Sequence, residues 1–208
     1  HPYLYSVNGG AYHSNMAYFN NYGPGVYTVE VMDSNNCTAQ DIIIIEEPDE
    51  LNVTINQSLW NGFSIKCHGD NSGYIDILVS GGNTPYTKTI LDANNSIFYS
   101  GTSNNITGFS AGIYSLTVTD NNGCSTQEFI TFNEPNPISH NFVIDHITCT
   151  GWSNGSITAI ISGGVGNSST YEYLWSTGDS TYSVDSLGIG NYTINVIDEN
   201  NCFYSAIA

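Results

Sequence analysis

Residues 108–112 read Gly-Phe-Ser-Ala-Gly, which fits the G-x-S-x-G pattern of a hydrolase nucleophile elbow. In that motif a strand runs into a sharp turn and a helix follows, so that the serine hydroxyl stands exposed and can attack a carbonyl carbon. Ser110 is therefore the first candidate for a catalytic residue. Whether it can act depends on the elements on either side of it.

Five cysteines form the second set of reactive side chains. In a chain rich in Asn, Gly, Ser, Thr and Tyr they indicate an oxidising, extracellular setting, where cysteines pair as disulfides. Because five is odd, at least one of them needs a partner outside this sequence. They are Cys37, Cys67, Cys124, Cys149 and Cys202.

The charge of the chain excludes several kinds of partner. Its 208 residues include 19 acidic side chains and only two basic ones, giving a net charge of −17. So few cations cannot neutralise phosphates, and we therefore expect no nucleic-acid partner. Anionic membrane surfaces repel such a chain, and no apolar run is long enough to insert into a bilayer. The sequence starts at His1, so we expect any secretion signal to lie outside it.

Two motifs recur along the chain. The first, G-x-Y-x-x-x-V-x-D-x-x-x-C, occupies residues 25–37, 112–124 and 190–202. The second, C-x-G-x-x-x-G-x-I followed by a Gly-Gly pair, occupies residues 67–82 and 149–164. Self-similarity at a spacing of roughly 80 residues indicates tandem copies of one module.

The repeats define three modules of unequal completeness. Residues 1–48 are expected to be the C-terminal part of one module, because His-Pro-Tyr at 1–3 matches Thr-Pro-Tyr at 84–86. Residues 49–136 form a complete module. Residues 137–208 are expected to form a module that lacks the end of its last strand.

Each module has the pattern of an all-β domain. In residues 114–119, Tyr, Leu and Val alternate with Ser and Thr, which is the period of a strand with one wet face. Asp-Asn-Asn-Gly at 120–123 supplies a tight hairpin turn, and a second strand returns after it. About seven short strands in roughly 80 residues, without helical periodicity, predict tandem immunoglobulin-like β-sandwich modules arranged as a linear rod.

This fold removes Ser110 as a nucleophile. A strand follows it where an elbow needs a helix, and the aligned positions in the other modules hold Gly23 and Gly188. We therefore expect no catalytic residue and no enzymatic activity. The repeated glycines and tyrosines have structural roles instead, the tyrosine at the place of a tyrosine corner on the sixth strand. They are Gly25, Gly112, Gly190, Tyr27, Tyr114 and Tyr192.

Together with a closing Glu-Pro, these motifs resemble the SprB-type repeat of Bacteroidetes cell-surface gliding-motility adhesins. The resemblance covers the whole chain and implies a secreted, extracellular filament whose modules serve as spacers and adhesive surface. The third module departs from the pattern, because a longer loop before Tyr171 replaces its Pro-Tyr.

Two disulfide schemes are open. Pairing within a module would join Cys67 to Cys124 and Cys149 to Cys202, but an intervening strand of about eight residues separates such cysteines by roughly 25 Å. A disulfide spans only about 4.4–6.8 Å between Cα atoms. We therefore favour the inter-module pair Cys67–Cys202, with Cys37, Cys124 and Cys149 paired outside the chain.

Other candidate sites are weaker. Asp33, Asp120 and Asp198 recur at the hairpin turns, where we favour turn capping as their role and keep them as weaker candidates for calcium ligands. We expect no other metal and no cofactor. Ser180 and Ser186 lie in Asp-Ser-x triplets that could accept O-linked sugar.

Two functions follow, from different classes. The first is a structural and adhesive segment of a surface filament, which contacts neighbouring repeats and a surface polysaccharide or other target. The alternative is an accessory carbohydrate-binding array of a secreted hydrolase. For sugar binding, Tyr171 and Tyr173 near the enlarged loop are expected to be exposed.

Overall fold

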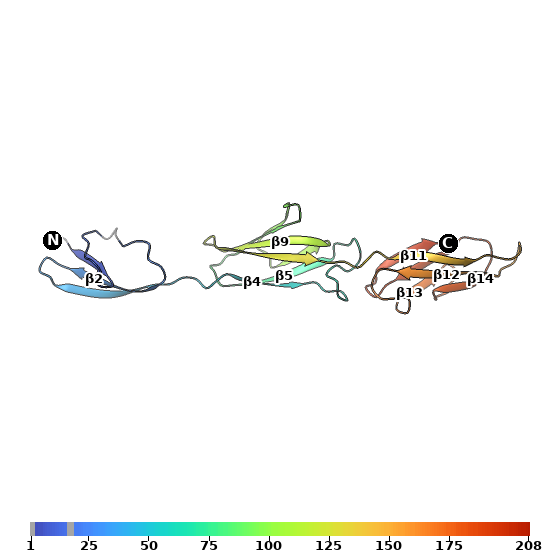
Figure 1. Cartoon of the computed structure of the whole chain (residues 1–208), viewed down its shortest axis with the longest axis horizontal. Coiled ribbons are helices and arrows are strands. Elements are labelled where there is room, and N and C mark those ends of the chain that lie inside the picture. The colour runs from blue at the N-terminus through green and yellow to red at the C-terminus, as the bar shows by residue number, and fades with distance from the viewer. Residues whose placement is uncertain (1–2, 16–18) are drawn as a thin grey trace. The chain divides into compact units, whose positions relative to one another are not determined.

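The computed structural model describes residues 3–15 and 19–208, and the regular elements in this part of the chain are all β-strands (Figure 1). His1 and Pro2, which begin the His-Pro-Tyr match, lie outside the described residues. The chain divides into two compact units, His1–Glu50 and Leu51–Ala208. The two sequence-defined modules after residue 48 thus fall into one unit.

The first unit contains one antiparallel sheet of order β1-β2-β3. Its strands are β1 (Leu4–Val7), β2 (Gly25–Met32) and β3 (Thr38–Ile45). Gly25 pairs with Ile45 and Met32 with Thr38, so β2 and β3 form a regular hairpin. Ile42, Ile43 and Ile44 stay exposed, since the described residues of this unit form no second sheet to cover them.

Within the second unit, strands β4 to β10 form a complete sandwich, which we call module 2. One sheet has the order β4-β5-β8, and the other has the order β10-β9-β6-β7. These are the A-B-E and G-F-C-C′ arrangements of an immunoglobulin-like domain. The strands are β4 (Asn52–Gln57), β5 (Gly73–Ser80), β6 (Thr87–Leu91), β7 (Ile97–Gly101), β8 (Asn105–Phe109), β9 (Gly112–Thr119) and β10 (Ser125–Phe132).

The core of module 2 lies between its two sheets. The alternation predicted for residues 114–119 is confirmed, because Tyr114, Leu116 and Val118 are buried there. Phe109 and Phe132 stack with their ring centroids 4.5 Å apart. Side chains from both sheets share one cluster, so the two sheets form a single hydrophobic core.

Strands β11 to β16 form a second sandwich, module 3, with a core of its own. Its sheets have the orders β11-β12-β14 and β13-β15-β16. Trp175 is buried at the centre, and its Nε1 donates a hydrogen bond to the Thr181 carbonyl at 2.9 Å. The strands are β11 (Ser139–Asp145), β12 (Gly155–Ser162), β13 (Glu172–Trp175), β14 (Ser183–Leu187), β15 (Thr193–Ile197) and β16 (Phe203–Ile207). The prediction of tandem immunoglobulin-like β-sandwiches is thereby confirmed.

Each module has a tyrosine corner. The hydroxyls of Tyr27, Tyr114 and Tyr192 each donate to the carbonyl four residues earlier, at 2.8, 3.3 and 3.1 Å. In module 2 that acceptor is the carbonyl of Ser110, and β9 begins two residues later at Gly112. Ser110 is therefore part of a turn that leads into a strand. The repeated glycines, Gly25, Gly112 and Gly190, lie beneath the ring of the tyrosine two residues later.

In the described part of the chain, no helix has the length and apolar character needed to cross a membrane.

Candidate functional site

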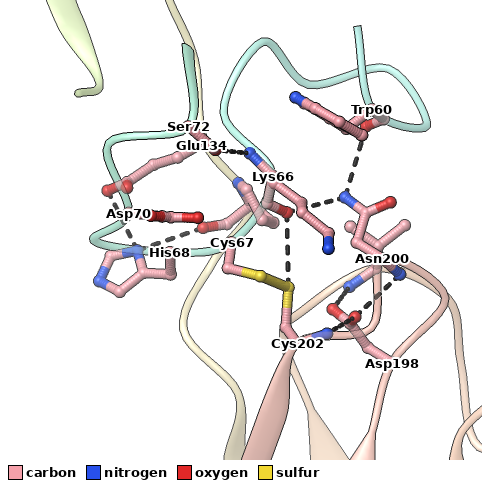
Figure 2. The surroundings of a disulfide bond; sticks show 12 residues. Trp60, Lys66, Cys67, His68, Asp70, Ser72, Glu134, Asp198, Asn200 and Cys202 are labelled. Carbon is pink, nitrogen blue, oxygen red and sulfur yellow. Dashed lines mark hydrogen bonds and ion pairs between the residues drawn. A yellow bond between two sulfur atoms is a disulfide. The ribbon is translucent and has the colours of Figure 1, made fainter. Parts of the chain in front are cut away.

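The structure joins module 2 to module 3 through a disulfide between Cys67 and Cys202, shown in Figure 2. The two Cα atoms are 5.7 Å apart although the residues are 135 positions apart in the sequence. This is the inter-module pair favoured above. Cys124 and Cys149, which a same-module scheme would use, are free and exposed, as is Cys37.

Module 3 contributes the turn between β15 and β16, residues 198–202. Asp198 Oδ1 accepts hydrogen bonds from the backbone N–H groups of Asn200, at 2.9 Å, and Cys202, at 2.8 Å. Its Oδ2 accepts the N–H of Val165 at 2.8 Å, which fixes the turn to the preceding loop. Asn201 adopts a left-handed conformation with φ of 59°, which Asn tolerates better than most residues. The buried carboxylate thus presents Asn200 and Cys202 in a fixed geometry.

Module 2 contributes the connection between β4 and β5. The side-chain amide of Asn200 donates to the Lys66 carbonyl at 2.8 Å (Figure 2). The side-chain amide of Asn61 donates to Asn200 Oδ1 at 2.8 Å. The sulfur of Cys202 lies 3.5 Å from the Lys66 carbonyl oxygen. Lys66 Nζ lies 5.9 Å from the Trp60 ring centroid, within range of a cation–π contact. Hydrogen bonds therefore align the two modules on either side of the disulfide.

The closing Glu-Pro of module 2 lies in the linker between modules 2 and 3, residues 133–138, and fixes it to the connection between β4 and β5. Glu134 Oε2 accepts the N–H of Gly69 at 2.6 Å, and Glu134 Oε1 lies 3.1 Å from His68 Nδ1. His68 Nδ1 is also 3.2 Å from the Pro135 carbonyl oxygen. The linker and the cysteine-bearing connection are thus held together next to the joint.

The Gly-Gly pair of module 3 has a role that sequence reasoning missed. Gly164 N–H donates to the Asn136 carbonyl at 2.8 Å, so the linker runs against this pair. A Cβ at Gly163 would lie 1.9 Å from the Pro137 carbonyl oxygen, and one at Gly164 would lie 2.8 Å from Ile138. Gly163 therefore permits a close approach of two backbone segments, and Gly164 leaves room for the side chains of Asp198 and Ile138. The sequence signal was the recurrence of Gly-Gly at 81–82 and 163–164, which we interpreted only as the end of a strand.

The other two aspartates cap equivalent turns. Asp33 Oδ1 accepts the N–H groups of Asn35 and Cys37, and Asp120 Oδ1 accepts those of Asn122 and Cys124. Among the described residues, no three His, Cys, Asp or Glu side chains gather in one place. All three aspartates thus cap their own turns, and their role as calcium ligands stays a prediction.

The Asp120 carboxyl of module 2 has a lowered pKa. The hydrogen bond from the Asn83 N–H, with further bonds from Cys124 and Asn122, lowers the pKa of the Asp120 carboxyl and outweighs its burial. A carboxyl whose pKa is lower in the folded state stabilises the fold above its unfolded pKa of about 3.9. That contribution disappears as the pH falls through the lower, folded pKa.

We therefore expect Asp120→Asn to destabilise the chain at pH 6, by an amount that shrinks as the pH approaches 2. Denaturant unfolding between pH 2 and 6 measures this. The matched control is Asp92→Asn, because Asp92 caps an exposed turn through bonds to Asn94 and Ser96 only. A pH-independent difference between wild type and Asp120→Asn would contradict the expectation.

The remaining candidates lie away from the joint. Ser180 and Ser186 are exposed in module 3, where they stay candidates for O-glycosylation. The expectation that Tyr171 and Tyr173 are exposed is wrong, because they are only 7% and 8% exposed. Both rings belong to the core of module 3, and the Tyr171 hydroxyl donates to the Gly163 carbonyl at 2.7 Å. Burial raises the pKa of both hydroxyls.

Two sandwiches, their tyrosine corners and a disulfide between them define a segment of tandem immunoglobulin-like modules linked covalently at the joint. The SprB repeat family matches residues 64–95 and 141–180, which begin in or just before the cysteine-bearing connections of modules 2 and 3. These two segments are SprB repeats, as the resemblance predicted. No curated protein matches the chain in sequence.

Several solved structures match the chain at low similarity. The three N-terminal domains of the highly immunogenic outer capsid protein of bacteriophage RB49 are 17% identical, with a TM-score of 0.42 over 76% of this chain and 58% of that one. The eight N-terminal Ig domains of Down syndrome cell adhesion molecule are 14% identical, with a TM-score of 0.41 over 88% of this chain and 26% of that one. A tetra-tandem repeat from the extending region of a large adhesion protein is 15% identical, with a TM-score of 0.29 over 89% and 56%. The chain thus spans less than two thirds of each of these structures.

Proposed function

We propose that this chain is a structural and adhesive segment of a long secreted filament on a cell surface, without catalytic activity. The observation that carries the proposal is the Cys67–Cys202 disulfide, which links two successive modules instead of the two sheets of one module. A bond placed there limits bending between the two modules, which is a mechanical and not a catalytic role. In the filament the modules would follow one another as a rod.

The charge of the chain suits this role. A net charge of −17 makes copies of the chain repel one another, which keeps an extended protein from aggregating. The linker between modules 2 and 3 carries Pro135 and Pro137 and is fixed by Glu134, so it is short and stiff. A stiff filament of this kind serves surface attachment, and gliding motility is one process that depends on attachment.

A second candidate function is supported by a groove on module 3. It has a volume of about 860 Å³ and is lined by β12, the loop after it and Tyr182. No acidic or basic side chain lines it, although the chain as a whole is strongly acidic. Tyr182 is 54% exposed, so its ring is free to stack on a sugar. We propose a neutral oligosaccharide as the ligand of this groove.

Two experiments test the two candidates, the first of them on the source organism. Antibodies against this chain should label intact cells and decorate thin surface fibres in electron micrographs. Labelling only inside permeabilised cells, or compact particles without fibres, would overturn the filament proposal.

In the second experiment, the purified chain is applied to neutral glycans, and Tyr182→Ala should weaken binding about tenfold by removing a stacked ring. If wild type binds none of the neutral glycans, the groove has no such function.

A further inference from the structure

Module 3 contacts module 2 through a cysteine-bearing turn, and turns of this kind occur three times in this chain. We use half-joint for the part that one module contributes to such a contact. We call residues 33–37, 120–124 and 198–202 the cysteine turns. In each one an aspartate Oδ1 accepts the N–H two residues later at 2.9 Å and the cysteine N–H four residues later at 2.8 Å. The fourth residue of each turn is Asn36, Gly123 or Asn201, with a positive φ of 64°, 88° or 59°. All three turns thus share one pattern of hydrogen bonds, and only the third carries a cysteine that is bonded to another module.

The half-joint on the module 2 side is present twice. We call residues 66–72 and 148–154 the cysteine loops. In the first, Lys66 N–H donates to Ser72 Oγ at 2.8 Å and Asp70 N–H to the Cys67 carbonyl at 3.1 Å. In the second, Thr148 N–H donates to Asn154 Oδ1 at 3.2 Å and Trp152 N–H to the Cys149 carbonyl at 3.1 Å. The residues correspond one by one, so the second loop is closed in the same way as the first.

One turn and one loop of this set are joined to each other, and the rest carry exposed, free thiols. Cys37 and Cys124 belong to the two other turns, and Cys149 belongs to the other loop. In the bonded pair, the Lys66 carbonyl accepts a hydrogen bond from the Asn200 side-chain amide. Thr148 corresponds to Lys66 in the second loop, and Asn35 and Asn122 correspond to Asn200 in the other two turns. Trp152, 57% exposed in the second loop, adds apolar surface beside Cys149.

We propose that the free cysteine turns and the free cysteine loop are complementary docking surfaces for other SprB-type modules, and that they join to them head to tail through a turn–loop disulfide. The inference deepens the proposed function by naming the partner: a module that presents the opposite half-joint. Within this chain the turns at 33–37 and 120–124 receive a loop, and the loop at 148–154 receives a turn. A second copy of this chain offers both halves.

The covalent step needs an oxidant, which a small-molecule disulfide supplies. A turn thiol and a loop thiol each lose their S–H bond, one S–S bond forms between them, and the small-molecule disulfide is reduced to two thiols. Docking precedes this exchange because the Asn amide and the loop carbonyl bring the two sulfur atoms close. The selectivity of the pairing therefore reports the docking.

The test uses the full 208-residue chain in a glutathione redox buffer near 0.15 M salt, where the Debye length of about 8 Å screens the repulsion between copies. Covalent oligomers are separated and their cross-links identified by mass spectrometry of unreduced peptides. We expect links from Cys149 to Cys37 or Cys124. Links between two turns, links between two Cys149 residues, or a mixture set only by chance would overturn the proposal, as would glutathionylated monomer alone.

Two sets of variants separate docking from simple thiol reactivity. Cys149→Ser should abolish the oligomers, and their persistence through turn–turn links would contradict the proposal. Asn35→Ala and Asn122→Ala keep the thiols and the backbone bonds of the turn, yet each should slow its own turn–loop link about fivefold, the effect of one lost hydrogen bond. Ser34→Ala and Asn121→Ala are the matched controls and should leave the rates unchanged. Equal slowing by a variant and its control would also overturn the proposal. The cross-linking results and the antibody labelling of cells are independent measurements. The docking proposal can therefore fail while the filament proposal holds, and the filament proposal can fail while the docking proposal holds.

Discussion

Stretching the oxidised chain by its two ends should release about 470 Å less contour length than stretching the reduced chain. The Cys67–Cys202 bond closes a loop with a sequence separation of 135, and an extended chain covers about 3.5 Å per residue. Tension enters module 2 at its N-terminal strand β4, crosses the disulfide and leaves along β16. Of the buried residues of the two cores, only Ile65 and Ala206 lie outside the closed loop, so most of each core is not unravelled while the bond is intact.

Single-molecule force spectroscopy with and without a reductant measures this difference. Cys202→Ser should release the longer contour without any reductant, whereas Cys37→Ser should behave as wild type because Cys37 is free. Equal contour lengths for the oxidised and reduced chains would show that the two cysteines are not bonded. In a filament, the consequence of the bond is that tension passes through the disulfide and spares the part of each sandwich that lies between Cys67 and Cys202.

Replacing Gly163 by alanine should cost about 3 kcal/mol of stability, a large effect for one methyl group. Gly163 has a φ of +82°, and the added Cβ would lie 1.9 Å from the Pro137 carbonyl oxygen and 2.7 Å from its carbon. Both obstacles are backbone atoms, so the linker must move away from module 3. That movement breaks the hydrogen bond from Gly164 to Asn136.

Gly178→Ala is the matched control for Gly163→Ala. Gly178 also has a positive φ, +97°, but no heavy atom lies within 4 Å of the position of its Cβ. It should therefore cost only the strain of a left-handed residue, about 1 kcal/mol. Denaturant unfolding of both variants measures the difference, and similar losses would show that the linker does not contact module 3 as described.

The local structure of this chain could be predicted from the order of its side chains. The alternation in residues 114–119 gave β9 and its buried face, and the Asp-Asn-Asn-Gly that follows gave the hairpin turn. The tyrosine two residues after each repeated glycine gave the tyrosine corner. These are short-range features, because a strand period or a turn depends on residues only a few positions apart.

Predictions about burial were less secure. The sequence shows that a longer loop precedes Tyr171, and a longer loop favours exposed neighbours. The structure instead buries Tyr171 and Tyr173 in the core of module 3. Burial depends on which strand packs against which, and the loop length alone does not reveal that.

The sequence by itself determined that the chain is a series of similar β-modules, that Ser110 is a turn residue, and that the five cysteines occupy two kinds of repeated position. Only the tertiary structure decided between the two disulfide schemes, placed Asn61 against Asn200, and brought Pro137 against Gly163. Asn61 and Asn200 are 139 positions apart, and no periodic pattern links residues at that distance. Their contact exists because two finished sandwiches meet at one end of each, where the shape of the surfaces selects the partners.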